Sequence, residues 1–200
     1  MGQNNGKLQV KDLVTIGIFT ALYIVVTLVF EVCGGIAPIV WIFMPAFVAL
    51  AGGVVYMTLT AKVQKWGAPF IMGTVMALIF CVRGGYALVL VTTMVIFGLL
   101  AEAVRKHFGY QNLKANLYSY PVFAMGMVGN LLPIWIFKDA FFNSRVDAGM
   151  PQAYYDMLEA LVSPTLLILM ILATFVCGIL GAFLGKALVR KHLEKAGMLS

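Results

Sequence analysis

The sequence is poor in the residues from which soluble enzymes build their sites. Only 11% of its 200 residues are charged, and it holds two histidines and three cysteines. It shows no Ser/His/Asp arrangement and no pair of histidines at a metal-ligand spacing. It also lacks a phosphate-binding glycine loop, so any ATP chemistry must come from a partner. The sequence therefore predicts a protein that is not an enzyme and that carries neither a cofactor nor a metal.

Long hydrophobic runs take the place of these features. Apolar residues make up 62% of the chain, and a helix needs about 20 of them in a row to cross a bilayer. The runs predict six spans at residues 12–30, 41–60, 66–82, 86–104, 117–137 and 164–188. They leave only short loops and no room for a separate soluble domain. We expect one all-α membrane domain over residues 1–200, a bundle of six transmembrane helices.

The basic residues are unevenly divided among the loops. Only Arg83, Lys138 and Arg145 fall in the connections after the first, third and fifth runs. The remaining basic residues lie at the chain ends and in the other two loops: Lys7, Lys11, Lys62, Lys65, Arg105, Lys106, Lys114, Lys186, Arg190, Lys191 and Lys195. Because cytoplasmic loops collect Lys and Arg, we expect a protein of the plasma membrane with both termini on the cytoplasmic side. The net charge of +6 then reflects topology, and no soluble basic patch points to nucleic acid.

Polar side chains gather near the predicted outer ends of the runs. Such groups are costly at membrane depth and mark functional sites. Together they predict an outward-facing pocket with apolar walls and few polar anchors, a form typical of small-molecule sites. The guanidinium of Arg83 offers a planar fork of donors to a carboxylate or phosphate. The candidate ligand contacts are Glu31, Arg83, Tyr86, Asn130, Trp135 and Lys138.

Each candidate also has a purely structural interpretation. Tyr86 and Trp135 fit the aromatic belt at a membrane interface. Glu31 and Arg83 are able to pair with each other at the rim, and Asn130 is able to bond a neighbouring helix. Cys33 and Cys81 both fall near outer helix ends, so they fit either a disulfide in an oxidising exterior or two isolated packing thiols.

Two further patterns concern helix ends and connections. On the predicted inner side, Glu102 with Arg105 or Lys106 has the spacing of a helix-end salt bridge. The longest connection contains residues 151–161, which form an amphipathic pattern. Such a helix lies on the membrane surface or caps a cavity. Pro151 suits its first turn, and its apolar face comprises Tyr154, Met157, Leu158 and Leu161.

Small residues recur four apart on three of the runs. Such ridges let membrane helices approach closely, where dispersion contacts hold them together. The ridges are Gly17 and Ala21 on the first run, Gly73, Ala77 and Cys81 on the third, and Ala173, Cys177, Gly181 and Gly185 on the last. For the third and last runs we expect packing inside the bundle. The first ridge fits either such packing or docking onto another membrane subunit.

The stretch from Lys7 to Leu22, KLQVKDLVTIGIFTAL, resembles the start of the substrate-binding S components of energy-coupling factor (ECF) transporters. The resemblance is closest to the Trep_Strep branch, and in size and topology it extends over the whole chain. It implies a subunit that captures substrate in an outward-facing cavity and then associates with a membrane scaffold subunit and two cytoplasmic ATPases. It also implies docking through two small residues four apart on the first helix, here Gly17 and Ala21.

The resemblance further bears on the ligand. It implies contacts from outer loops and outer helix halves, where Arg83, Tyr86, Asn130 and Lys138 fall. Substrates of such proteins are vitamins, their precursors and transition-metal ions. A metal ion does not fit, because this chain lacks the extended amino terminus with histidine ligands. We expect a small organic micronutrient. Haem, or another tetrapyrrole, is a second candidate, and its iron would need Met44, Tyr86 or Cys33 as a ligand.

Two rival hypotheses remain. The alternative function is a stand-alone secondary transporter of a small solute, although the sequence lacks the buried carboxylates and paired broken helices of such carriers. A membrane enzyme would need a clustered nucleophile and base, which the sequence does not show.

Overall fold

The computed structural model describes residues 7–83, 86–146 and 151–195, and backbone alone for Arg83, 144–146 and 191–195. This part of the chain is helical and has no strand, as expected. Its elements are α1 (Val10–Gly34), α2 (Pro38–Ile42), α3 (Met44–Lys62), α4 (Ala68–Phe80), η1 (Cys81–Arg83), α5 (Ala87–Phe108), α6 (Leu113–Ala124), η2 (Met125–Asn130), α7 (Pro133–Ile136), α8 (Lys138–Val146), α9 (Gln152–Leu161) and α10 (Pro164–Lys195).

Among the described residues, four helices are long and apolar enough to cross a membrane: α1, α3, α5 and α10 as far as Arg190. The predicted span 66–82 corresponds to α4, which has 13 residues and continues into η1. The predicted span 117–137 is not one helix, because it breaks into α6, η2 and α7. Gly126 and Gly129 weaken the α-helix there, and Pro133, which has no N–H to donate, starts the next helix.

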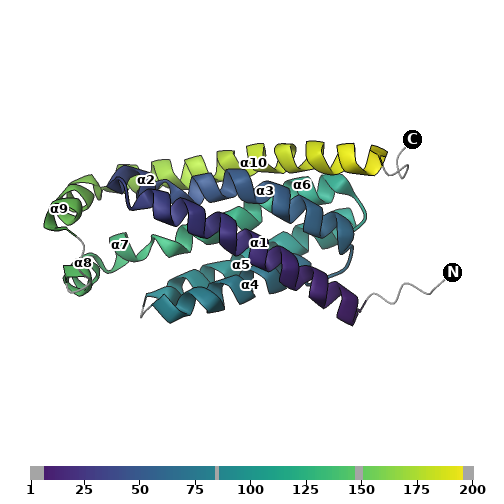
Figure 1. Cartoon of the computed structure of the whole chain (residues 1–200), viewed down its shortest axis with the longest axis horizontal. Coiled ribbons are helices and arrows are strands. Elements are labelled where there is room, and N and C mark those ends of the chain that lie inside the picture. Colours follow the sequence, from purple (N-terminus) through teal and green to yellow (C-terminus); the bar gives the residue numbers. More distant parts are fainter. Residues whose placement is uncertain (1–6, 84–85, 147–150, 196–200) are drawn as a thin grey trace.

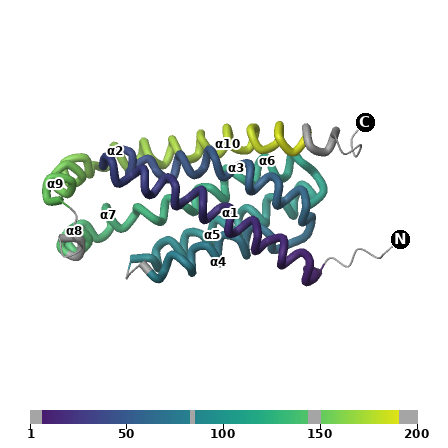
Figure 2. Tube along the Cα trace, in the orientation of Figure 1, coloured from purple at the N-terminus to yellow at the C-terminus, as the bar shows by residue number. Residues whose placement is uncertain are grey.

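The chain runs back and forth along the long axis of the bundle (Figures 1 and 2). The start of α1 and the end of α10 lie at one end, which we call the terminal end. The connections α3–α4 and α5–α6 also lie there. The opposite end carries α2, α8 and α9, and we call it the cap end. The eleven basic residues that the sequence assigns to one side fall toward the terminal end.

The outer surface of α1 is apolar, and its inward face carries polar side chains beside the core residues Ile16 and Tyr23. Asp12, Thr20 and Thr27 are buried, whereas Val14 and Val25 are more than half exposed. Each inward threonine hydroxyl donates to the carbonyl one turn earlier, at 2.8 Å for Thr20 and 2.9 Å for Thr27. This arrangement is the reverse of a soluble helix, and it suits a hydrocarbon surround.

Small residues bring α3 and α10 into backbone contact. A Cβ atom on Gly53 would overlap the backbone of Gly181, and one on Gly185 would lie 2.5 Å from the carbonyl oxygen of Gly53. On α4, a Cβ on Gly73 would lie 2.9 Å from the Phe123 ring. The ridges of the third and last runs therefore pack inside the bundle, as expected. Gly17 differs, because a Cβ there meets nothing within 4 Å.

The three cysteines lie in the described part and are free thiols. Of the two interpretations of Cys33 and Cys81, the structure therefore supports isolated thiols rather than a disulfide.

The contrast between Gly181 and Gly17 gives a stability prediction. We expect Gly181→Ala to destabilise the bundle by about 1–3 kcal/mol or more, because the new methyl group overpacks the α3–α10 contact. Gly17→Ala is the matched control, and it should be neutral or stabilising, because alanine favours helix by about 1 kcal/mol over glycine. Thermal unfolding in detergent measures both. Equal melting temperatures for the two variants would contradict the close α3–α10 contact.

Candidate functional site

The break in the fifth run places two ridges of η2 against different neighbours. A 3₁₀ helix has three residues per turn, so residues three apart share one ridge. Gly126 and Gly129 form the ridge that meets α5, where added Cβ atoms would overlap Met94 and Thr93. The Thr93 hydroxyl donates to the carbonyl of Gly126 at 2.8 Å. Because of this close contact, the break is held firmly on α5.

The other ridge of η2 carries Met127 and Asn130, which line a crevice between four segments. Thr27 comes from α1, Met76 and Phe80 from α4, and Leu90 from α5. The space is about 140 Å³ including open solvent, and it has no room for a water-sized sphere. The crevice is thus closed in this structure.

Asn130 is half-buried beside this crevice. Among the described residues its amide has one polar contact, from Nδ2 to the sulfur of Met44 at 4.0 Å. A thioether is a weak acceptor, so most of the hydrogen-bonding capacity of this amide is unused. The interpretation of Asn130 as a simple bond between helices therefore accounts for little of its side chain.

Above the crevice an aromatic cluster fills the cap end. The Tyr86 ring lies 5.6 Å from that of Phe137 and 5.9 Å from that of Phe141, and Trp41 stacks on Phe141 at 6.2 Å. Such pairs contribute about 0.5–1.5 kcal/mol each beyond the area they bury. The predicted outward pocket is therefore packed with aromatic side chains here rather than open.

The helix predicted at 151–161 is confirmed as α9, and it belongs to this cap. Its buried residues are Tyr155 and Leu158, whereas Met157 is exposed, so the predicted apolar face is partly wrong. The Tyr154 hydroxyl donates to the Gly34 carbonyl at 2.9 Å, which ties α9 to the end of α1. Burial raises the pKa of this phenol, so it keeps its proton at neutral pH.

The structure brings the predicted ligand residues to the cap end but gives them different surroundings. Of those whose side chains the structure describes, Asn130 alone lines the crevice. Trp135 donates from Nε1 to the Ser163 carbonyl at 3.0 Å. Lys138 pairs with Glu159 at 3.1 Å on the exposed surface.

The remaining predicted residues are Glu31, Arg83 and the side chains considered for a haem iron. Glu31 is half-buried on α1, one turn beyond Thr27, and the side chain of Arg83 lies outside the described residues. Of the side chains considered for a haem iron, Met44 is buried beside Asn130. Tyr86 is held in the aromatic cluster.

Sequence reasoning missed most of the crevice lining. It did not single out Thr27, Met76, Phe80, Leu90 or Met127. One signal was present in the fifth run: two glycines three apart, with a methionine and an asparagine at the same spacing one position later. If the run forms a 3₁₀ turn, this spacing places the two glycines on one ridge and the methionine and asparagine on another.

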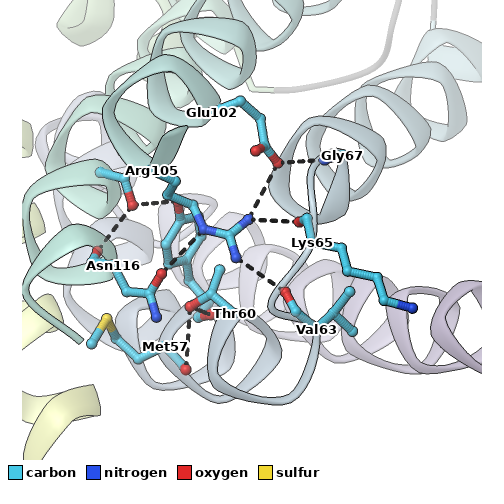
Figure 3. Close-up of polar contacts among 10 residues, drawn as sticks. Met57, Thr60, Val63, Lys65, Gly67, Glu102, Arg105 and Asn116 are labelled. Carbon is cyan, nitrogen blue, oxygen red and sulfur yellow. Dashed lines mark hydrogen bonds and ion pairs between the residues drawn. The ribbon is translucent and has the colours of Figure 1, made fainter. Parts of the chain in front are cut away.

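A second polar cluster lies at the terminal end, and Arg105 is its centre (Figure 3). Its fully buried guanidinium contacts Glu102 Oε1 at 3.3 Å, as the spacing predicts, and Asn116 Oδ1 at 3.1 Å. It also donates to the Val63 carbonyl at 3.0 Å and to the Lys65 carbonyl at 3.4 Å. The predicted helix-end salt bridge is therefore confirmed, but inside the bundle rather than on its surface.

The same cluster fixes the connection between α3 and α4. Glu102 Oε1 accepts the Gly67 N–H at 2.9 Å, and Gly67 has a φ of +100°, which favours glycine. The Lys65 ammonium extends away from Arg105 (Figure 3) and pairs with Asp12 at 2.6 Å. The network thus joins α1, the α3–α4 connection, α5 and α6, and we interpret it as a clamp.

The Tyr110 ring lies 5.1 Å from the Arg105 guanidinium carbon. Burial and the nearby Glu102 carboxylate raise the pKa of this phenol. In the described part no group of three or more His, Cys, Asp or Glu side chains is placed to hold a metal ion.

Comparison with protein families gives a match over most of the chain. Residues 10–195 match a protein family described as hypothetical bacterial integral membrane protein (Trep_Strep). No curated protein and no solved structure matches the chain.

The clamp gives a second prediction. Arg105→Met should destabilise the protein by about 3–5 kcal/mol, because it leaves Glu102 buried without its cation. Lys106→Met removes a cation from the exposed neighbouring position and should change stability by less than about 0.5 kcal/mol. Unfolding of the detergent-solubilised chain measures both changes. If the two variants unfold alike, Arg105 is not the centre of the clamp.

Proposed function

The chain belongs to the Trep_Strep family of bacterial integral membrane proteins, and from that premise we propose that it is the substrate-binding subunit of an ECF-type ATP-driven importer. It captures a small organic micronutrient at the cap end. It delivers this substrate together with a separate membrane scaffold and two cytoplasmic ATPases. The observation that carries the proposal is the closed crevice beneath the cap, with the half-used amide of Asn130 on its wall.

The topology that supports this role has six crossings in the plasma membrane. Four are the long helices α1, α3, α5 and α10. The third crossing is α4 with η1, and the fifth is α6, η2 and α7 in series. Irregular backbone at membrane depth is tolerated where it is buried in protein or lines a cavity, and η2 meets the first condition, because four of its six residues are buried. The excess of basic residues at the terminal end supports a cytoplasmic location for both termini.

The described charged groups favour a binding subunit over a stand-alone carrier. Proton-coupled carriers use chains of buried ionisable groups that face their substrate. Here the buried carboxylates of Asp12 and Glu102 pair with Lys65 and Arg105 at the terminal end, and the described lining of the crevice carries no charged side chain. The chain therefore needs energy from elsewhere, which a scaffold with ATPases supplies.

The outward face of α1 is the proposed docking surface for the scaffold. Gly17 and Ala21 are both exposed, and a Cβ on Gly17 meets no neighbour within the chain. The matching small residues of α4 and α10 are already used in internal packing. A flat, small-residue face lets a second helix approach closely in lipid.

Docking is tested by enlarging this face. Gly17→Leu and Ala21→Leu should each abolish ATP-dependent uptake by cells that express the importer, because a bulky side chain holds the scaffold helix away. Both variants should keep the substrate that remains bound to the purified wild-type chain, identified by native mass spectrometry. Ala103→Leu, at an exposed position on α5, is the control and should transport normally. Full uptake by both α1 variants, or uptake into vesicles by the purified chain alone, would refute the proposal.

Sidedness is tested by labelling in intact cells. In a variant without the three native cysteines, Asn112→Cys lies in the α5–α6 connection and Gln152→Cys at the start of α9. A membrane-impermeant maleimide should label the cysteine at position 152 readily and the one at position 112 only after the cells are opened. The reverse pattern would place the termini outside and overturn the proposed topology.

A further inference from the structure

The crevice is almost free of charge, and this bears on what can enter it. Its lining in the described part comprises four apolar side chains, the hydroxyl of Thr27 and the amide of Asn130. On the premise of the binding-subunit function, we propose that the substrate enters the crevice through an uncharged edge that carries a hydrogen-bond donor beside an acceptor. A carboxamide, a lactam or a related cyclic amide has such an edge.

Asn130 supplies the matching pair of groups. An asparagine amide has two N–H donors and one carbonyl acceptor, and its one polar contact here is the 4.0 Å approach to the Met44 sulfur. Its carbonyl and one N–H therefore remain for a ligand. Two amide edges pair by two hydrogen bonds, in the way that asparagine recognises the edge of adenine.

Thr27 completes the polar side of the crevice. Its hydroxyl hydrogen is already donated to the Tyr23 carbonyl at 2.9 Å, so its oxygen can only accept. The crevice thus offers one donor–acceptor pair and one further acceptor. A ligand edge with donors and acceptors of its own fits this set, whereas an anion, which only accepts, fits it poorly.

Charged ligand groups are disfavoured for a second reason. An ionised group buried without a partner loses far more hydration than neutral hydrogen bonds restore. The nearest described acid on α1, Glu31, lies one turn beyond Thr27, and Lys138 is paired with Glu159 on the exposed surface. Any charge on the substrate therefore remains at the rim of the crevice.

The crevice must open to admit such an edge, and its methionines make this feasible. Met76 and Met127 line it, and Met44 lies beside Asn130. Methionine side chains are unbranched and flexible, so they change rotamer at low cost. The backbone of η2 is pinned to α5 by its glycines and by the Thr93 hydroxyl. We therefore infer that side chains move and that the helices stay in place.

The test uses three probes with one ring and different head groups: benzamide, benzoate and benzylamine. Binding to the purified full chain in lipid nanodiscs is followed by ligand-observed NMR at neutral pH. The Met127→Ala variant has the crevice enlarged, so it should bind all small probes better than the wild-type chain does. In that variant benzamide should bind at least about tenfold more tightly than either charged probe.

Substitution of Asn130 shows whether its amide is responsible for the binding of benzamide. Asn130→Leu in the Met127→Ala background should lower benzamide affinity about tenfold, the loss expected for one or two neutral hydrogen bonds. The affinity for toluene, which has no polar head, should not fall. Asn143→Leu makes the same change at an exposed position on α8 and should leave benzamide binding unchanged.

Three outcomes would overturn the ligand class: a charged probe that binds as well as benzamide, benzamide binding that survives Asn130→Leu, or no binding of any probe to Met127→Ala. The proposed function fails separately. If benzamide binds through Asn130 but the chain supports no uptake with a scaffold and ATPases, the proposed ligand site is supported and the importer role is refuted. If uptake is intact and the probes fail, only the ligand class falls.

Discussion

The structure depends on one constraint: hydrocarbon offers no hydrogen bonds, so each polar group at membrane depth needs a partner inside the protein. On α1 this constraint turns Asp12, Thr20 and Thr27 inward and leaves apolar side chains outside. In the centre of the bundle the Tyr120 hydroxyl donates to the Ala49 carbonyl at 2.6 Å. At the terminal end it gathers four partners around the fully buried guanidinium of Arg105. The small residues of α3 and α10 address a second effect of the hydrocarbon. Lipid supplies no hydrophobic driving force between helices, and close backbone contact between α3 and α10 replaces it.

The predicted fifth span shows how a local exception to this constraint shapes the candidate site. Its helix breaks at η2, where backbone groups lose their regular partners, and the Thr93 hydroxyl of α5 satisfies one of the freed carbonyls. The break then turns Met127 and Asn130 toward α1 and α4. A hydrogen-bonding group that has no partner at such a break costs free energy unless a ligand binds to it. Under the proposed function, the crevice and the cap above it form one binding region, which is closed in this structure.

The sequence was sufficient to predict the features that follow from its composition and from the spacing of its residues. Long apolar runs predict the four long helices, small residues four apart predict the α10 packing, and the spacing of Glu102 and Arg105 predicts their salt bridge. The break at η2 could not be foreseen, because an apolar run with two glycines and a proline also fits a kinked helix. The crevice lining was missed for a related reason. Met76, Leu90 and Met127 look like ordinary core residues until the fold shows which space they share, and the filling of the cap by Tyr86, Phe137 and Phe141 depends on long-range packing.

The ion pair between Asp12 and Lys65 has a consequence for biogenesis. The two residues are 53 positions apart in the chain, so the ribosome delivers α1 to the insertion machinery well before the partner of its carboxylate exists. Until then the carboxylate has only local support, from the Gln9 N–H at 2.8 Å and from the neighbouring Lys11. When the α3–α4 connection emerges, Lys65 adds the cation that ties α1 to this connection, so a contact between distant parts of the chain replaces purely local support.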